Sequence, residues 1–397
     1  MIEELSRTNK EINPGLYVHV PFCISKCNYC DFFSLERNKN YVSMYLTGLK
    51  NELQVYHDFL EENLSFDTVY IGGGTPTSLD HPDLEKFFGL IFDKVEIKAD
   101  AEITIEANPC TLDNEKLDLI RSYSNRISLG MQSSHDHYLE LLGRGHDFED
   151  FLYTYEMVVK YYPNINLDLI YGIPGETITE AEKDISALLD LYPPHISLYC
   201  LTLEEGTRLH YLVENGLIEE KISDELKAEM YYMARDTLMD NGYEHYEISN
   251  FSLPGYSAKH NIIYWRRGSY LGIGPGGHSF WNNQRWHNPQ DLDLYLSKSR
   301  SSLRKKQNFL RENIQELDFN EAVFEEFFLG LRLTEGIDLK KLSSKYDLDL
   351  YDLFNDKIKK LEKKGLLSVD KNTVKLTPKG YMLANQVFIE FLESLDK

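Results

Sequence analysis

Three cysteines within one short segment are the most reactive group of side chains in the sequence. Cys23, Cys27 and Cys30 lie in HVPFCISKCNYCDFF (19–33) with the spacing C-x3-C-x2-C. Thiolates are soft ligands suited to iron–sulfur clusters and to zinc. Most protein metal sites have four ligands, so the fourth has to be a distant residue, a water or a small molecule.

Zinc binding and a purely structural role are the two alternatives for these cysteines. A zinc site needs a fourth protein ligand, and His19, His57 and Cys110 are candidates, but none has the spacing of a zinc finger. Buried structural cysteines are rarely flanked by charged residues such as Lys26 and Asp31. The spacing therefore favours an iron–sulfur cluster and leaves the other two uses open.

Further polar residues and glycines gather near the ends of predicted strands. The cysteine segment follows the first strand, and GGGTP (72–76) ends the second. Glu106 ends the third strand, Gln132 ends the fourth, and Asp168 lies within the fifth. Because the loops after parallel strands meet on one side of a barrel, we expect these groups to share one site.

Six strand–helix units have to position these groups. From about residue 15 the chain alternates β-branched runs with amphipathic stretches, which predicts parallel strands joined by right-handed crossovers. Apolar strands covered on both faces are typical of a barrel or partial barrel. The predicted strands are GLYVHV (15–20), DTVYIGG (67–73), AEITIEAN (101–108), RISLGMQ (126–132), NINLDLIYG (164–172) and HISLYCLT (195–202), and the helical stretches include 41–63 and 182–192.

The composition is that of a folded, acidic protein. The 397 residues are 42% hydrophobic and 13% aromatic, which is ample for a core and for more than one domain. A formal net charge of −22 argues against a nucleic-acid partner, because such partners are bound largely through Lys and Arg. The sequence predicts neither a signal peptide nor a membrane span. Five cysteines without a disulfide pattern indicate the reducing cytoplasm.

The last part of the chain, 305–397, has a different pattern. Three helical segments (319–333, 339–347 and 350–367) precede a hairpin and a closing helix, which predicts a mainly helical, winged-helix-like domain. Its basic run KIKKLEKKG is offset by acidic residues, so we expect a lid or docking module rather than a DNA-binding domain. The expected division is a barrel with its lead-in over 1–250, a connecting segment over 251–304 and this domain over 305–397.

Two of these segments resemble the signature motifs of the radical S-adenosylmethionine (SAM) superfamily. CISKCNYC has its cysteine pattern, and IGGGTPTSL is similar to its glycine-rich motif. The resemblance implies a partial (β/α)6 barrel and a [4Fe–4S] cluster bound by Cys23, Cys27 and Cys30. It also implies that the amino and carboxylate groups of SAM bind the fourth iron, so that the missing ligand is a cosubstrate.

Other segments resemble one branch of that superfamily, which contains the oxygen-independent coproporphyrinogen III oxidases and the heme chaperones (HemW type). The similar segments are YVHVPFC, GGGTPTSL, LGMQS, LLGRGH and LDLIYGIPGET, and the similarity covers nearly the whole chain. The alternative for each polar member of the site is an ordinary hydrogen-bonded residue at the barrel rim. By resemblance, the SAM contacts are Tyr17, Tyr29, Gly73, Gly74, Thr75, Glu106, Gln132, Arg144 and Asp168.

The segment HNIIYW (260–265) matches the H-N-x-x-Y-W motif of the heme chaperones. By resemblance, His260 contacts heme, while Tyr264 and Trp265 can pack against a porphyrin face. The alternative is that His260 caps a turn and the aromatic residues fill the core. His278, in GPGGHSF, is an alternative neighbour of the SAM site.

Two departures from the oxidases favour the chaperone branch. The oxidases have a fourth cysteine two residues beyond the third, where this sequence has Phe32, and an N-terminal extension, where only about 14 residues precede the first strand. The expected function is to bind heme and transfer it to acceptor hemoproteins. The alternative is an enzyme that cleaves SAM to a 5′-deoxyadenosyl radical and decarboxylates coproporphyrinogen III.

Overall fold

A sheet of 12 strands forms the centre of the molecule in the computed structural model, which describes residues 14–59, 64–218, 222–305, 307 and 309–392. The strand order is β14-β13-β12-β11-β1-β4-β5-β6-β7-β8-β10-β9. In the described part of the chain the end strands β14 and β9 do not pair with each other, so the barrel is open.

The six predicted strands form the parallel middle of this sheet, which confirms the partial (β/α)6 barrel. Between them, α6 begins at a capping box, in which the side chains of Thr177 and Glu180 accept from each other's backbone N–H. The parallel strands are β1 (Gly15–Val20), β4 (Ser65–Gly73), β5 (Glu96–Ala107), β6 (Arg126–Gln132), β7 (Ile165–Tyr171) and β8 (His195–Cys200).

Alternation along these strands separates an apolar outer face from a polar inner face. On β1, Val18 and Val20 are fully buried in the core under the helices, whereas Tyr17 and His19 line an inner cavity. The helices of this part are α1 (Lys39–Phe59), α2 (His81–Phe92), α3 (Asn114–Ile120), α4 (Asp136–Leu141), α5 (Phe148–Val158), α6 (Ile178–Leu191), α7 (Arg208–Glu214), α8 (Asp224–Asp240), α9 (Lys259–Trp265) and α10 (Leu292–Lys305).

The segment 251–304 and the start of the region 305–397 contribute strands to the same sheet, which the sequence pattern did not predict. β11 (Tyr270–Ile273) pairs in parallel with β1, and β12 (His278–Trp281), β13 (Gln284–His287) and β14 (Glu312–Glu316) follow in antiparallel order. At the other end, β10 (Asn250–Ser252) and β9 (Glu244–Glu247) extend β8.

A buried acid on α1 attaches this added sheet to the barrel. The Glu52 carboxylate accepts hydrogen bonds from the backbone N–H of Gly274 (2.8 Å), the Asn288 amide (2.6 Å) and the Tyr295 hydroxyl (2.6 Å). Burial raises the pKa of Glu52 to about 7, although these three donors oppose the shift.

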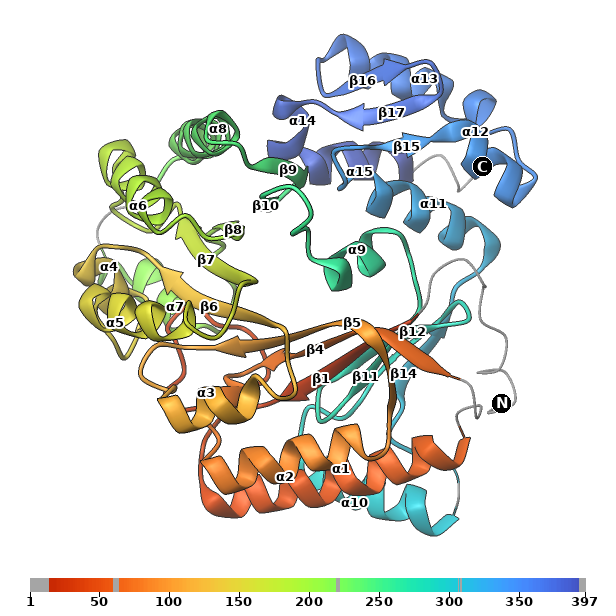
Figure 1. The fold of residues 1–397 in the computed structure, drawn as a ribbon. Helices are drawn as coiled ribbons and strands as arrows, with labels where there is room; N and C mark the ends of the chain where they lie inside the picture. The colour runs from red at the N-terminus through yellow and green to blue at the C-terminus, as the bar shows by residue number, and fades with distance from the viewer. Residues whose placement is uncertain (1–13, 60–63, 219–221, 306, 308, 393–397) are drawn as a thin grey trace.

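The C-terminal domain has the predicted order of three helices followed by a hairpin, and two helices follow where one closing helix was predicted. Its own core includes Val323, Phe327, Phe354 and Phe391. The α11 helix lies beside α9, between the sheet and the remaining C-terminal helices (Figure 1). The elements are α11 (Phe319–Gly330), β15 (Ile337–Asp338), α12 (Leu339–Tyr346), α13 (Leu350–Lys363), β16 (Leu367–Asp370), β17 (Thr373–Leu376), α14 (Pro378–Met382) and α15 (Ala384–Leu392). Among the described helices, none is both long and apolar enough to cross a membrane.

Candidate functional site

The cysteine segment forms a loop between β1 and α1. It contains the short parallel pair β2 (Phe22–Cys23) and β3 (Leu35–Glu36). Asn28 fixes the loop to the end of α4, because its backbone N–H donates to the Leu142 carbonyl and its side chain donates to the Leu141 carbonyl, both at 2.9 Å. The loop conformation therefore depends on the folded barrel around it.

The three cysteines of this loop are half-buried free thiols. Burial raises the pKa of Cys30 to about 11 and also raises the pKa of Cys23, so both favour the protonated form when no metal is bound. In the described residues, no group of three or more His, Cys, Asp or Glu side chains is arranged to hold a metal ion. Three neighbouring thiols on one loop nevertheless have the donor chemistry that an iron–sulfur cluster uses.

A chain of polar side chains connects two of these cysteines to later strands. The Thr75 hydroxyl donates to the sulfur of Cys23 at 3.7 Å and accepts from the Asn108 amide at 2.8 Å. Arg144 donates to the oxygen of the same Asn108 side chain and, at 3.6 Å, to the sulfur of Cys27. The structure thus brings two predicted SAM contacts, Thr75 and Arg144, directly to the cysteine loop.

The glycine-rich turn after β4 packs against the same loop. Gly73 has φ +104°, and a Cβ there would lie 2.3 Å from the His19 ring. A Cβ on Gly74 would lie 2.7 Å from the Phe22 backbone, and the Gly74 N–H donates to the Val20 carbonyl at 2.9 Å. Gly73 requires glycine because of its positive φ and the His19 ring, and Gly74 because no side chain fits between its backbone and that of Phe22.

Two half-buried acids, Glu106 and Asp168, lie on the inner face of the sheet. Glu106 accepts from the Tyr70 hydroxyl at 2.7 Å and from the Gly73 N–H at 3.0 Å. Burial, with a contribution from Asp168, raises the pKa of Glu106 to about 7. Asp168 accepts from Asn166 at 2.8 Å and Ser128 at 3.1 Å, and burial raises its pKa as well.

Gln132 and Arg144 approach each other over Gly130. A Cβ added to Gly130 would lie 2.8 Å from the Gln132 amide nitrogen and 2.9 Å from an Arg144 nitrogen. Gln132 has φ +66°, and among the described residues its buried Oε1 has no hydrogen-bond partner. Tyr29 is half-buried beside Arg144, and burial raises the pKa of its hydroxyl. A strained residue with an unsatisfied buried acceptor is suited to a ligand that donates a hydrogen bond.

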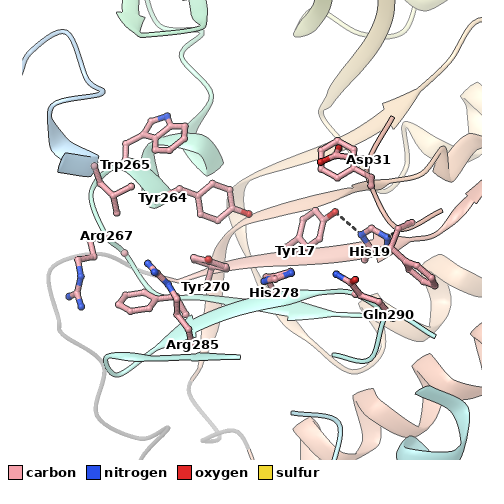
Figure 2. Close-up of a pocket in the computed structure, with 16 residues that line it drawn as sticks. Tyr17, His19, Asp31, Tyr264, Trp265, Arg267, Tyr270, His278, Arg285 and Gln290 are labelled. Atoms are coloured by element: carbon pink, nitrogen blue, oxygen red, sulfur yellow. Dashed lines mark hydrogen bonds between the residues drawn. The ribbon is translucent and has the colours of Figure 1, made fainter. Parts of the chain in front are cut away.

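A cavity of about 530 Å³ opens between the cysteine loop and the segment 264–285 (Figure 2). At its wall the His19 Nε2–H donates to the Phe33 carbonyl, so Nδ1 accepts from the Tyr17 hydroxyl, both at 2.9 Å. Burial lowers the pKa of His19 to about 4, which keeps this imidazole neutral. The lining side chains are mainly aromatic and include Tyr17, Phe32, Phe33, Tyr264, Trp265, Tyr270 and Phe280.

His260 lies behind this cavity wall. Only 1% of the residue is exposed, and its ring nitrogens form 2.7 Å hydrogen bonds with the Thr68 hydroxyl and the Tyr264 hydroxyl. Burial lowers its pKa to about 3. The carboxylate of Glu102 accepts from the backbone N–H groups of Lys259 and His260 at 3.1 and 3.0 Å, which fixes the start of α9. His260 therefore positions Tyr264, which does line the cavity.

His278 is the exposed histidine of the cavity wall. It lies on β12 opposite His287 of β13, with ring centroids 5.1 Å apart. Partial removal of the ring from water and the neighbouring His287 and Arg285 lower its pKa, which favours the neutral imidazole. The sequence motifs did not identify Arg267 or Arg285 as further residues of this wall; only their position after HNIIYW could have suggested them.

Family models match both parts of the chain. The Radical SAM superfamily model matches residues 17–188, and the HemN C-terminal domain model matches residues 317–383. Among curated proteins, the heme chaperone HemW of Lactococcus lactis subsp. lactis is 35% identical over 378 residues, covering 95% of this chain and 96% of that protein. HemW of Bacillus subtilis is 35% identical, with 96% and 99% covered, and HemW of Escherichia coli is 32% identical, with 81% and 83% covered.

A solved structure of coproporphyrinogen III oxidase (HemN) from Escherichia coli has the same fold. It aligns with a TM-score of 0.83 and covers 98% of this chain and 92% of that chain, at 21% sequence identity. At this identity the likeness concerns the arrangement of helices and strands alone.

Proposed function

Because this chain belongs to the radical SAM family that contains the heme chaperone HemW, we propose that it binds heme and transfers it to acceptor hemoproteins. The observation that carries the proposal is the aromatic cavity beside the cysteine loop, one wall of which comes from the HNIIYW segment. Aromatic side chains provide flat apolar contacts of the kind that a porphyrin requires.

We further propose that Cys23, Cys27 and Cys30 bind a [4Fe–4S] cluster and that SAM binds beside it. Such a cluster, when bound through three thiolates, supplies an open iron for the amino and carboxylate groups of SAM and a source of one electron. Arg144 and Thr75 support the cluster by donating to the sulfurs of Cys27 and Cys23.

The remaining polar residues would hold SAM. Glu106 and Asp168 are acceptors for its hydroxyl or ammonium groups, and the unsatisfied oxygen of Gln132 is a third acceptor. Gly73 and Gly74 provide a surface without side chains. Tyr17 lies on β1 before the loop, and Tyr29 lies within it between Cys27 and Cys30. Because burial raises the pKa values of Glu106 and Asp168, a partner with a positive charge would stabilise their ionised forms.

We propose that the imidazole of His278 would bind the heme iron and that His260 would act as a supporting residue. A neutral, exposed imidazole on the cavity wall is available for coordination. Coordination by His260 would instead require loss of its hydrogen bond to Thr68 or Tyr264.

The test is anaerobic reconstitution of the purified protein with iron, sulfide and SAM, followed by two assays. Heme retention after gel filtration, without conversion of coproporphyrinogen III under reducing conditions, is the expected result. Multiple-turnover formation of protoporphyrinogen without retained heme would replace the chaperone proposal with the oxidase.

A further inference from the structure

Two arginines and one glutamate form an ion-pair cluster at the end of the cavity farthest from the cysteine loop. Arg267 Nε donates to Glu325 Oε2 at 2.8 Å, and Arg285 Nη2 donates to Oε1 of the same carboxylate. Figure 2 shows Arg267 and Arg285 on the side of Tyr264 and Trp265, away from His19 and Asp31. Both arginines line the cavity.

The cluster carries one positive charge in excess, because a single carboxylate faces two guanidinium groups. The side chains of Arg267 and Glu325 are only 7% and 5% exposed, so this pair is nearly removed from water. Arg267 also donates to the Asn283 side chain at 2.9 Å. Its guanidinium is thus held in place by two partners, and buried charges are stable only when paired in this way.

Arg285 is the accessible member of the cluster. Its side chain is 39% exposed, and one of its nitrogens donates to Glu325. A guanidinium has five N–H donors in a planar fork, so the bond to Glu325 leaves capacity for a second carboxylate. The guanidinium carbons of Arg267 and Arg285 lie 4.7 and 5.5 Å from the centre of the Phe280 ring, which also lines the cavity.

We propose that Arg285 binds a carboxylate of the ligand in this cavity, and that Arg267 and Glu325 are the positioning residues that hold it there. This inference rests on the proposed heme binding: it assigns the arginine end of the cavity to a propionate group of a tetrapyrrole. The aromatic wall takes the flat apolar ring, and the excess positive charge takes its ionised edge.

The C-terminal domain takes part in ligand recognition under this proposal. Glu325 lies on α11, whereas Arg267 follows α9 and Arg285 lies on β13. Leu329 of α11 lines the same cavity. The domain therefore sets the position of the carboxylate-binding arginine and is more than a cover.

The experiment compares hemin with hemin dimethyl ester, whose propionates carry no charge, on the reconstituted full-length protein. We expect the wild type to bind hemin about tenfold more tightly than the ester, the effect of one charge-assisted hydrogen-bonded pair. Arg285→Gln should abolish this preference by weakening hemin binding alone, and Arg285→Lys should keep part of it. Glu325→Gln should also reduce the preference for hemin over the ester while ester binding stays unchanged. A general loss of structure would weaken the binding of both compounds.

Arg266→Gln is the matched control. Arg266 is adjacent in sequence, 53% exposed and paired with Glu335 at 3.0 Å, so its loss should leave the hemin preference unchanged. The visible absorption of the proposed [4Fe–4S] cluster and the thermal unfolding curve of each variant show whether it is folded.

Further results distinguish a wrong propionate assignment from a wrong proposal of heme binding. SAM also carries a carboxylate, so a fall in SAM affinity in Arg285→Gln, with hemin binding unchanged, would overturn the propionate assignment. Equal binding of hemin and its ester by the wild type would also overturn it, while the proposed heme binding would stand. Failure of the wild type to bind either compound would refute the proposed function itself.

Discussion

Arg144 donates a hydrogen bond to the sulfur of Cys27 at 3.6 Å, although 117 positions separate the two residues. The guanidinium also reaches the Asn108 side chain, which donates to Thr75. The cysteine loop is therefore held by groups from the second, third and fourth strand–helix units. Hydrogen bonds within the protein therefore attach the loop to the barrel without a cofactor.

The first prediction concerns the cluster. Replacement of Cys23, Cys27 and Cys30 by serine should abolish the broad visible absorption of the reconstituted protein, because three thiolates are lost. Far-UV circular dichroism should remain unchanged, because these cysteines lie outside the hydrophobic core. Cys200→Ser, which removes an exposed cysteine on β8, is the control and should retain the cluster. A triple variant that still binds about four irons per chain would show that the ligands are elsewhere.

The second prediction concerns SAM. Asp168→Asn and Glu106→Gln should each weaken SAM binding by about tenfold or more, because a charge-assisted hydrogen bond is worth roughly 1.5–3 kcal/mol. Equilibrium dialysis with labelled SAM measures the effect, and iron content shows that the cluster is retained. Glu52→Gln changes a buried acid on α1, outside the proposed SAM site, and should leave SAM affinity as it is. Wild-type affinity in both site variants would refute the proposed SAM site.

The third prediction separates two histidines. His278→Ala should shift the heme Soret band, because the imidazole proposed to bind the iron is lost. His260→Ala should weaken heme binding without that shift, because it frees Tyr264 from its 2.7 Å hydrogen bond but leaves the iron ligand in place. His287→Ala, across the strand pair from His278, is the control. The opposite pattern, a Soret shift in His260→Ala alone, would make His260 the ligand.

The fourth prediction concerns pH and stability. Burial raises the pKa of Glu52 to about 7, above its value in the unfolded chain, so the folded protein binds the extra proton between those values. The stability contributed by the protonated acid is present at low pH and is lost as pH rises through about 7. The wild-type free energy of unfolding, relative to Glu52→Gln, should therefore fall by about 2–3 kcal/mol between pH 5 and pH 8. Urea denaturation at both pH values measures it, and a constant difference would contradict a raised pKa.

The parallel core was predictable because its signals are local. GLYVHV and RISLGMQ were predicted with their observed bounds as β1 and β6, and the winged-helix-like order of the C-terminal domain followed from helical periodicity. The family could be assigned from the sequence because its motifs lie in contiguous segments. The similarity to known proteins confirms this assignment. Short-range patterns carry this information without any knowledge of tertiary contacts.

The added strands and the arginine cluster were not predictable because they depend on distant partners. β11 has four residues, and Gly272 within it approaches the His278 carbonyl so closely that an added Cβ would lie 2.0 Å away. Likewise, nothing near Glu325 in the sequence indicates that it pairs with Arg267 and Arg285. Similarly, the environment of His260 depends on Thr68, a residue of a different strand.

The position of Glu325 on α11 has a consequence for biosynthesis. A ribosome releases the chain from its N-terminus, and domains generally fold as they emerge. The cysteine loop and all six parallel strands are complete before α11 is synthesised. A nascent chain at that stage has its thiols and glycine-rich turn in place but lacks the glutamate that holds both arginines. Insertion of the proposed [4Fe–4S] cluster can thus precede competence for a carboxylate-bearing ligand, because translation completes the cysteine loop before α11.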